Sequence, residues 1–334
     1  MDRVSLACGN GGEESNKLIE DIFYKYFKCD ELLKGLDSAI LNKIDGNIAV
    51  TTDSFVIKPI FFNGGNIGKL SVCGTLNDLA VSGAIPLYIT TAFIIEEGLL
   101  INDLEKIVIS ISEEAKRNNV SIICGDTKVV EKGKCDGIYI NTTGIGILNN
   151  KANLGYGRIE CGDKIVVSGT IGDHGMSIMC SRENLELQNN IYSDCKSLCE
   201  LTNLIINSGL NVKFMRDPTR GGLATTLREI VDSSNKSMKI KEESIKVRDD
   251  VSNVCDMLGL DPLYIANEGK IICIVSNDDS NKLLELIKGK ECGINASIIG
   301  EVIDDYNNEL YFETLIGGTR ILNRVSGDEL PRIC

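Results

Sequence analysis

The stretch LEKIVISISEEAKRNNVSIICGDT, residues 104–127, predicts the fold class of this chain. Its first half repeats apolar residues at the spacing of one helix face: Leu104, Ile107, Val108, Ile111 and Ala115. Its second half has a short apolar run, Val120 to Cys124, that leads into Gly125-Asp126-Thr127. An amphipathic helix followed by a buried strand is typical of an α/β protein.

The same alternation continues in both directions from this stretch. Upstream, Ile48 and Val50 lead into Thr51-Thr52-Asp53-Ser54, a strand that ends in polar residues, and Leu70, Cys73, Leu76 and Ala80 repeat at helical spacing. Downstream, the residues expected in strands are 138–141, 164–168, 270–275 and 297–302, and helical spacing recurs at 198–205 and 223–231.

Asn, Gly and charged residues cluster without periodicity near 149–162, which indicates a domain boundary. We therefore expect two α/β domains of similar size. The predicted parts are an N-terminal segment (1–42), an N-terminal α/β domain (43–150), a C-terminal α/β domain (151–320) and a flexible tail (321–334).

The composition argues against nucleic acid and membranes as partners. The chain has 334 residues, a formal charge of −13 and no Trp, so it lacks basic and aromatic surfaces for nucleic acid. No apolar run is long enough to span a bilayer and the N-terminus lacks a signal-peptide core, so we expect a cytoplasmic protein. The 13 scattered cysteines are typical of reduced thiols.

Several carboxylates follow or interrupt apolar segments, and as a set they indicate a magnesium site. Asp37 precedes Ser38-Ala39-Ile40, Asp53 ends a strand, Asn77-Asp78 interrupts a helix, and Asp126 follows a strand. Asp and Asn are poor mid-helix residues, so Asn77-Asp78 needs either solvent or a ligand. Mg²⁺ prefers oxygen ligands and usually bridges to phosphates. Taken singly, each Asp is better explained as a turn or cap residue.

Two glycine-rich stretches and one histidine are weaker candidates. Asn63 to Ser71 (NGGNIGKLS) resembles a phosphate loop but has the wrong glycine spacing and Leu70 after the Lys, so an anion site and a plain entry turn remain open. Gly9-Asn10-Gly11-Gly12 is similar. His174, the only histidine, has no evident catalytic partner, and we expect it at a turn before a helix.

The end of the sequence, Leu330-Pro331-Arg332-Ile333-Cys334, presents a terminal thiol. From Arg324 onward an extended chain reaches roughly 30–36 Å. Such a segment fits a swinging arm that carries a reactive Cys334, whereas an accidental terminal cysteine is the simpler reading of the residues alone.

Together these stretches match a known family. They are TTDS (51–54), FFNGGNIGK (61–69), NDLAVSGAIP (77–86), FIIEEG (93–98), GDTKVV (125–130), SGTIGDHG (168–175), RDPTRGG (216–222), ANEGK (266–270) and the terminal PRIC (331–334). In this order they resemble, almost end to end, the HypE family of hydrogenase maturation carbamoyl dehydratases.

The resemblance implies a fold and an assembly. Members share a two-domain α/β (α+β) fold with aminoimidazole ribonucleotide synthetase and selenophosphate synthetase. The N-terminal domains of two subunits pair into a β-barrel across a homodimer, and ATP binds near the dimer seam.

It also implies the reaction and the partners. A HypF-like carbamoyltransferase loads a carbamoyl group onto Cys334, and the enzyme uses ATP and Mg²⁺ to dehydrate this thiocarboxamide to a thiocyanate. The cyano group then passes to an iron-bearing HypC–HypD-like complex and becomes the cyanide ligand of the NiFe-hydrogenase iron centre.

The resemblance assigns site residues by motif. By this resemblance Cys334, Glu268 and Lys128 are the catalytic residues. Glu268 is favoured as the proton acceptor at the modified cysteine, and a neutral Lys128 could share that role only if burial lowered its pKa. The nucleotide contacts are Asp53, Asn77, Asp78, Gly125, Asp126 and Thr127. The Mg²⁺ carboxylates are Asp37, Asp53, Asp78 and Asp126.

One segment departs from the family pattern. Members usually have a His-Gly start to the N-terminal glycine-rich segment, where this chain reads Ala7-Cys8-Gly9-Asn10-Gly11-Gly12. An N-terminal Cys raises the alternative of a selenophosphate synthetase-like ATP enzyme, although the lysine expected shortly after it is absent. A second alternative is a non-catalytic thiol carrier in metallocentre assembly, which would need no ATP.

Overall fold

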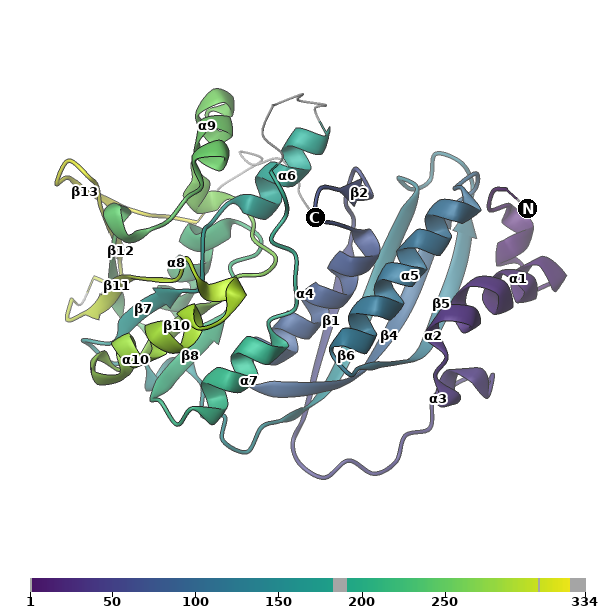
Figure 1. The fold of residues 1–334 in the computed structure, drawn as a ribbon, viewed down its shortest axis with the longest axis horizontal. Helices are drawn as coiled ribbons and strands as arrows, with labels where there is room; N and C mark the ends of the chain where they lie inside the picture. Colours follow the sequence, from purple (N-terminus) through teal and green to yellow (C-terminus); the bar gives the residue numbers. More distant parts are fainter. Residues whose placement is uncertain (1, 183–190, 306, 325–334) are drawn as a thin grey trace.

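The computed structural model describes residues 2–182, 191–305 and 307–324 and places them in two α/β units joined along one long helix (Figure 1). The predicted alternation of helices and strands is confirmed in both units.

The first unit is a four-stranded sheet in the order β1-β6-β4-β5. Only β4 and β5 are parallel; the other pairs are antiparallel. Its elements are β1 (Ile48–Phe55), the short pair β2 (Phe61–Phe62) and β3 (Gly65–Asn66), α4 (Ile67–Val81), β4 (Ala84–Glu96), α5 (Ile101–Arg117), β5 (Ser121–Val130) and β6 (Ile138–Leu148).

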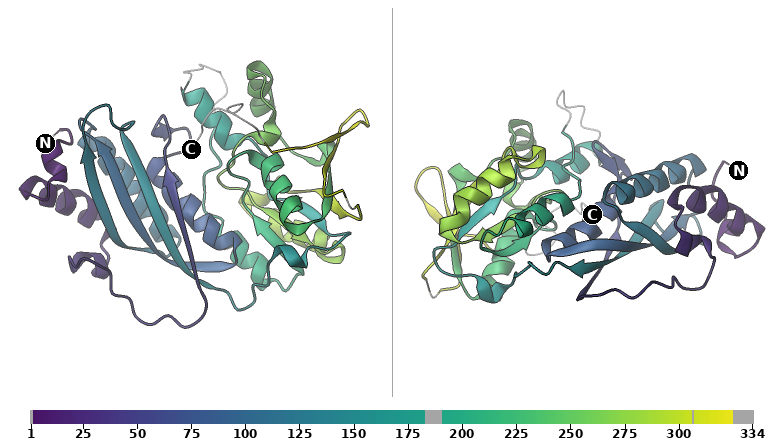
Figure 2. Two further views of the ribbon diagram at one scale, coloured as in Figure 1. Left: turned by 180° about the vertical axis from the view of Figure 1, so that it is seen from behind. Right: turned by 60° about the horizontal axis from the view of Figure 1, so that its bottom comes forward.

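Helices α4 and α5 cover one face of this sheet. The apolar face of α5 is fully buried at Leu104, Ile107 and Ile111, as its spacing predicts. Seen from behind, the other face of the sheet is covered by none of the described helices (Figure 2). That face exposes apolar side chains: Ile48, Val50, Ile85 and Ile94 are 57%, 63%, 46% and 44% exposed.

Two strands extend further than the sequence indicates. β1 continues past Asp53 to Phe55, and β5 continues through Gly125-Asp126-Thr127 to Val130. Each has a long neighbour, since β4 and β6 run for 13 and 11 residues and pair with them throughout. The polar residues that resemble strand ends are therefore positions on half-covered edge strands, where polar side chains are tolerated.

An N-terminal segment packs beside β5, at the right of Figure 1. It contains α1 (Glu13–Leu18), a π-helical turn (Ile19–Tyr24), α2 (Lys25–Phe27) and α3 (Asp30–Leu33). Residues 34–47 form a segment without helix or strand. It runs from α3 past the lower end of the sheet in Figure 1 to β1, which forms the edge opposite β5.

The second unit is a mixed seven-stranded sheet in the order β13-β12-β9-β11-β7-β10-β8. Its strands are β7 (Lys164–Val167), β8 (Val212–Arg216), β9 (Ser237–Lys241), β10 (Ile272–Val275), β11 (Ser297–Ile303), β12 (Leu310–Glu313) and β13 (Thr319–Ile321). Its helices are α6 (Asp173–Arg182), α7 (Cys199–Asn207), α8 (Gly222–Ser234), α9 (Asp249–Leu258) and α10 (Asn277–Lys288).

Helices cover both faces of this second sheet. Val166 of β7 packs in one apolar cluster with α7 and α10, and its neighbours Ile165 and Val167 pack in another with α8. Because successive side chains of a strand point to opposite faces, α8 lies on the face opposite α7 and α10.

Helix α4 joins the two units. Residues on every side of it are buried, including Ile67, Leu70, Cys73 and Leu76 at 0% exposure, because the first sheet lies on one side and α7 and β8 lie on the other. No helix within the described residues is long and apolar enough to cross a membrane.

Candidate active site

A polar cleft of about 600 Å³ lies where β1 and α4 meet the second unit. The loop between β8 and α8 and the segment ending at Glu268 form its other wall. Its charged side chains are Asp53, Asp78, Arg216, Asp217, Arg220, Glu229 and Glu268. Three of the predicted site residues, Asp53, Asp78 and Glu268, therefore line one cleft although they are far apart in the sequence.

Asp53 and Asp78 face each other across the β1–α4 contact. The alternation of β1 turns Asp53 toward α4, where Thr75 Oγ1 donates a hydrogen bond to Asp53 Oδ2 at 3.2 Å. Thr51 Oγ1 donates to Asp78 Oδ2 at 2.8 Å. Burial, and then the negative charge of Asp78, raises the pKa of Asp53. The two carboxylates therefore stand close enough to repel each other.

Asp217 is a third cleft carboxylate, and our site prediction missed it. It lies directly after β8, in the RDPTRGG stretch (216–222), which contains none of the predicted site residues. Burial, followed by the charge of Asp78, raises the pKa of Asp217 to about 7. The available signal was a carboxylate directly after a strand, the same pattern that drew attention to Asp126.

The loop after Asp217 can adopt its path only with glycine at its end. Gly222 has φ +63°, and a Cβ there would lie 2.6 Å from the carbonyl oxygens of Leu263 and Ile265. Any other residue would push the start of α8 away from the segment that leads to Glu268.

Glu268 is 3% exposed and is held by its backbone. Its amide N–H donates to Asp194 Oδ1 at 3.1 Å, and its carbonyl accepts from Asn77 Nδ2 at 3.2 Å. Burial raises the pKa of Glu268 well above its usual range, and the nearby Cys195 and Asp217 add to the shift. In such surroundings the ionised carboxylate is a stronger base than that of an exposed Glu, which suits a proton acceptor once the group has lost its own proton.

Asn77, a predicted nucleotide contact, uses its whole amide to join the two units. Its Nδ2 donates to the carbonyls of Lys196 and Glu268 at 3.1 and 3.2 Å, and its Oδ1 accepts from Leu198 N at 2.8 Å. This explains a buried Asn in the middle of α4: in this structure it positions Glu268 from the opposite wall of the cleft.

The donor set of the cleft fits a magnesium ion. Asp53, Asp78 and Asp217 supply oxygen ligands only. Asp217 is buried and the other two are half-buried, and their mutually repelling charges favour a divalent cation. Within the described ranges, however, no three His, Cys, Asp or Glu side chains are already arranged to hold a metal ion. The carboxylates therefore need further oxygen ligands to complete such a site.

The remaining predicted nucleotide residues line a different cavity. Gly125, Asp126, Thr127 and Lys128 of β5 border a space of about 430 Å³ together with the N-terminal segment. Gly9 belongs to the same wall and approaches β5 so closely that a Cβ would lie 2.9 Å from the backbone nitrogen of Val129. The glycine-rich segment whose role the sequence left open thus lies beside the Gly125–Lys128 strand.

One chain does not bring Asp126 and Asp53 together. They lie on β5 and β1, the two edges of the four-stranded sheet, so three strand spacings of about 4.8 Å separate them. Asp37 is exposed in the 34–47 segment. Cys334 lies outside the described residues. Of the four predicted magnesium carboxylates, the structure brings together Asp53 and Asp78.

Two of the three weaker sequence candidates, the Asn63–Ser71 stretch and His174, have structural roles. Asn66 caps α4, since its Oδ1 accepts from the backbone amides of Gly68 and Lys69 at 2.9 and 3.1 Å, which leaves those amides unavailable to an anion. His174 is fully buried in α6, its Nδ1 lies 2.8 Å from Ser193 Oγ, and burial lowers its pKa to about 4.

Comparison with known proteins places both units in one family. Residues 35–148 match the N-terminal domain, and residues 160–313 the C-terminal domain, of the AIR synthase related proteins. The carbamoyl dehydratase HypE of Rhizobium leguminosarum bv. viciae is 44% identical over 333 residues, which cover 99% of this chain and 95% of that protein.

Solved structures agree along the whole chain. A hydrogenase maturation protein HypE in complex with ATP superposes with a TM-score of 0.94 at 41% identity and covers 99% of both chains. The structure of a HypE–HypF complex gives a TM-score of 0.81 at 47% identity and covers 92% of this chain and 99% of that one. The chain therefore belongs to the HypE family of carbamoyl dehydratases, within the AIR synthase related proteins.

Proposed function

We propose that this enzyme uses ATP to dehydrate a carbamoyl group carried on its own Cys334, which makes a thiocyanate for the cyanide ligand of a NiFe-hydrogenase. Family membership supports the reaction. The observation that carries it in this chain is the buried Glu268 in one cleft with three aspartates from both units.

The chemistry needs two steps. First, the carbamoyl oxygen attacks the γ-phosphorus of ATP, ADP leaves, and the nitrogen loses one proton. Then the C–O bond breaks, phosphate departs with the bonding electrons, the nitrogen loses its second proton, and a C≡N bond forms on sulfur. Phosphorylation is required because an amide oxygen is otherwise a poor leaving group.

Glu268 is the proton acceptor in this scheme. Its raised pKa makes its carboxylate a stronger base than an exposed Glu. Asn77 and Asp194 hold the backbone on either side of it, so its carboxyl group has a defined place in the cleft. Lys128, assigned by motif, remains a proposed partner at the modified cysteine.

Asp53, Asp78 and Asp217 would hold Mg²⁺ together with the phosphate oxygens of ATP. Bound there, the ion would neutralise charge on the transferring phosphoryl group. Arg216 and Arg220 line the same cleft and are placed to attract the nucleotide's phosphates. Asp37 and Asp126 stay predicted ligands.

A homodimer would complete the site. The uncovered apolar face with Ile48, Val50, Ile85 and Ile94 is suited to pairing with a second copy, as in the β-barrel expected from the family. We propose that the Gly125–Lys128 strand of one subunit then faces the Asp53–Asp78 group of the other, which accounts for their separation within one chain.

The expected partners follow from the reaction. A solved HypE–HypF complex supports a HypF-like carbamoyltransferase as the donor to Cys334. An iron-bearing HypC–HypD-like complex as acceptor, and a cytoplasmic location, remain predictions.

Intact-mass measurement tests the reaction directly. Incubation with the carbamoyltransferase, its carbamoyl donor, ATP and Mg²⁺ should add one carbamoyl group at Cys334 and then remove one water. Cys334→Ser should show neither change. An adduct at another residue, or an adduct that never loses water, would refute the proposal.

A further inference from the structure

The chain that leads to Cys334 is fastened just before residues 325–334 begin. Arg320 Nη2 binds Asp261 Oδ2 at 2.8 Å, Tyr264 Oη donates to the carbonyl of Asn323 at 3.1 Å, and Arg324 Nη2 binds Asp232 Oδ2 at 2.8 Å. We call residues 320–324 the tail root. Its position is fixed on two sides, by α8 and by the segment 261–264.

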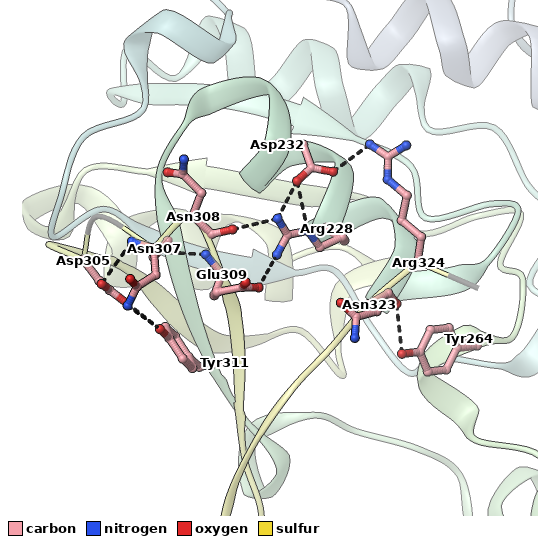
Figure 3. A network of polar contacts seen from close by, with 11 residues as sticks. Arg228, Asp232, Tyr264, Asp305, Asn307, Asn308, Glu309, Tyr311, Asn323 and Arg324 are labelled. Atoms are coloured by element: carbon pink, nitrogen blue, oxygen red, sulfur yellow. Dashed lines mark hydrogen bonds and ion pairs between the residues drawn. The ribbon is translucent and has the colours of Figure 1, made fainter. Parts of the chain in front are cut away.

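The ion pair between Arg324 and Asp232 belongs to a larger polar network, which is drawn in Figure 3. Arg228 of α8 binds Asp232 Oδ1 through Nε and Nη2 at 3.0 and 2.5 Å, and binds Glu309 Oε2 through Nη1 at 2.7 Å. Its Nη2 also donates to the carbonyl of Asn308 at 2.7 Å. Arg228 lowers the pKa of Asp232, and Arg324 adds to this, so Asp232 stays charged and available to the root.

The other contacts of the tail root are made by residues 261–264, which lie shortly before Glu268, the proposed proton acceptor. Asp261 and Tyr264 precede Glu268 by only a few residues, and the intervening Asn267 is buried. Its Oδ1 accepts from Gly172 N at 2.8 Å and its Nδ2 donates to the carbonyl of Pro218 at 2.9 Å. One fixed segment, 261–268, therefore holds both the tail root and Glu268.

We propose that Tyr264 and Asp232 are positioning residues, which set the point from which residues 325–334 reach the cleft relative to Glu268. This rests on the proposed function, since only a substrate carried on Cys334 needs such a fixed origin. Residues 325–334 span at most about 33–36 Å, so the origin decides how often the carbamoyl group meets the site. The rate at which a tethered group reaches a site in the same molecule depends steeply on the position of the point where the tether begins.

The test follows single-turnover dehydration in the full chain by intact mass, starting from protein already carbamoylated at Cys334. Tyr264→Phe removes the bond to the Asn323 carbonyl and keeps the ring; Asp232→Asn removes the charge that Arg324 binds. Each should slow water loss about three-fold, the loss expected for one weak polar contact, with unchanged ATP affinity.

Matched variants and a double-mutant cycle separate positioning from general damage. Tyr311→Phe removes a hydroxyl that binds Asp305 in the same network, away from the root, and should dehydrate at the normal rate. Asp232→Asn combined with Arg324→Gln should be no slower than either change alone, because both break the same pair.

Normal dehydration rates in both Tyr264→Phe and Asp232→Asn would overturn the proposal. So would a slower rate accompanied by weaker ATP binding, since that marks damage to the cleft. Failure of the unaltered chain to lose water would refute the proposed function itself, and this outcome is distinct because it needs no variant.

Discussion

A single buried carboxyl group decides whether the cleft can remove protons. Glu268→Gln keeps the shape and burial of the side chain but cannot accept a proton. We expect the dehydration rate of carbamoylated protein to fall at least 100-fold, within the usual contribution of a general base, while ATP affinity is retained.

Glu229→Gln is the matched control for this change. Glu229 lines the same cleft but pairs with Arg216 at 2.5 Å, so its loss should leave dehydration within a few-fold of normal. Equal effects of the two substitutions, read by intact mass, would show that Glu268 acts only through the charge of the cleft.

Asp217 gives the stability of the protein a pH dependence with a defined sign. The folded state binds a proton with a pKa of about 7, whereas an unfolded Asp has its ordinary value of 3.8. The folded chain therefore holds an extra proton between these values, and the free energy of unfolding falls as pH rises through this window.

We expect Asp217→Asn to raise the free energy of unfolding by roughly 4 kcal/mol at about pH 8 and by less than half of that, roughly 1.5 kcal/mol, at about pH 5. Urea unfolding at both values measures this, with Asp278→Asn, on an exposed carboxylate of α10, as the control. An equal gain at both pH values would contradict the assignment.

At the scale of single residues, the sequence could predict which residues belong to the site better than it could predict their contacts. Asp53, Asp78 and Glu268 were all predicted site residues, and they do line one cleft. Asn77 attracts attention because it is a polar residue in the middle of a helix. Sequence spacing, however, cannot distinguish a contact with a ligand from hydrogen bonds to three backbone groups in the other unit. Asp217 was missed because its meaning comes from burial beside Asp53 and Asp78.

Helix α4 packs against both units, and the side chain of Asn66 caps its first turn. Asn66→Ala removes the cap on Gly68 and Lys69 and the bond from Nδ2 to Ser110 Oγ. We expect a loss of about 1–2 kcal/mol in unfolding free energy and normal ATP affinity.

Calorimetric ATP binding and urea unfolding decide between a cap and a phosphate loop. Asn207→Ala, at the exposed end of α7, should alter neither quantity. Loss of ATP binding in Asn66→Ala at normal stability would restore the phosphate-loop interpretation.

Elements were predictable where one face alone is buried. The spacing of apolar residues located α5 because solvent covers its other face. The ends of the strands were not predictable from the sequence. β1 and β5 continue, with polar residues, beyond the points where the sequence pattern indicates an end. Pairing with the long strands β4 and β6, which a local pattern cannot reveal, extends them.

For the whole molecule, the separation of Asp53 and Asp126 leads to a complementation experiment. If each site combines Asp53 of one subunit with Asp126 of the other, Asp53→Ala and Asp126→Ala chains should each be inactive alone. Co-expressed, they should form mixed dimers with one intact site, and about a quarter of the normal number of sites should recover.

Single-turnover dehydration of the mixture measures the recovery. The same pair of variants carrying Ile48→Lys, which places a charge on the uncovered sheet face, should stay monomeric and show none. Ile316→Lys, on the exposed turn after β12 and away from the uncovered sheet face, serves as a control that leaves recovery intact. No recovery in a mixture that contains dimers would exclude a shared site.

The amide of Asn77 has one more consequence, for the way water is kept from the reaction. Because it binds Lys196, Glu268 and Leu198 from the centre of a buried helix, moving the two walls of the cleft apart would break three hydrogen bonds. These bonds oppose a hinge closure of the units around a substrate. Exclusion of solvent falls to the molecules that enter: the nucleotide and the modified cysteine have to fill a space whose width is already set.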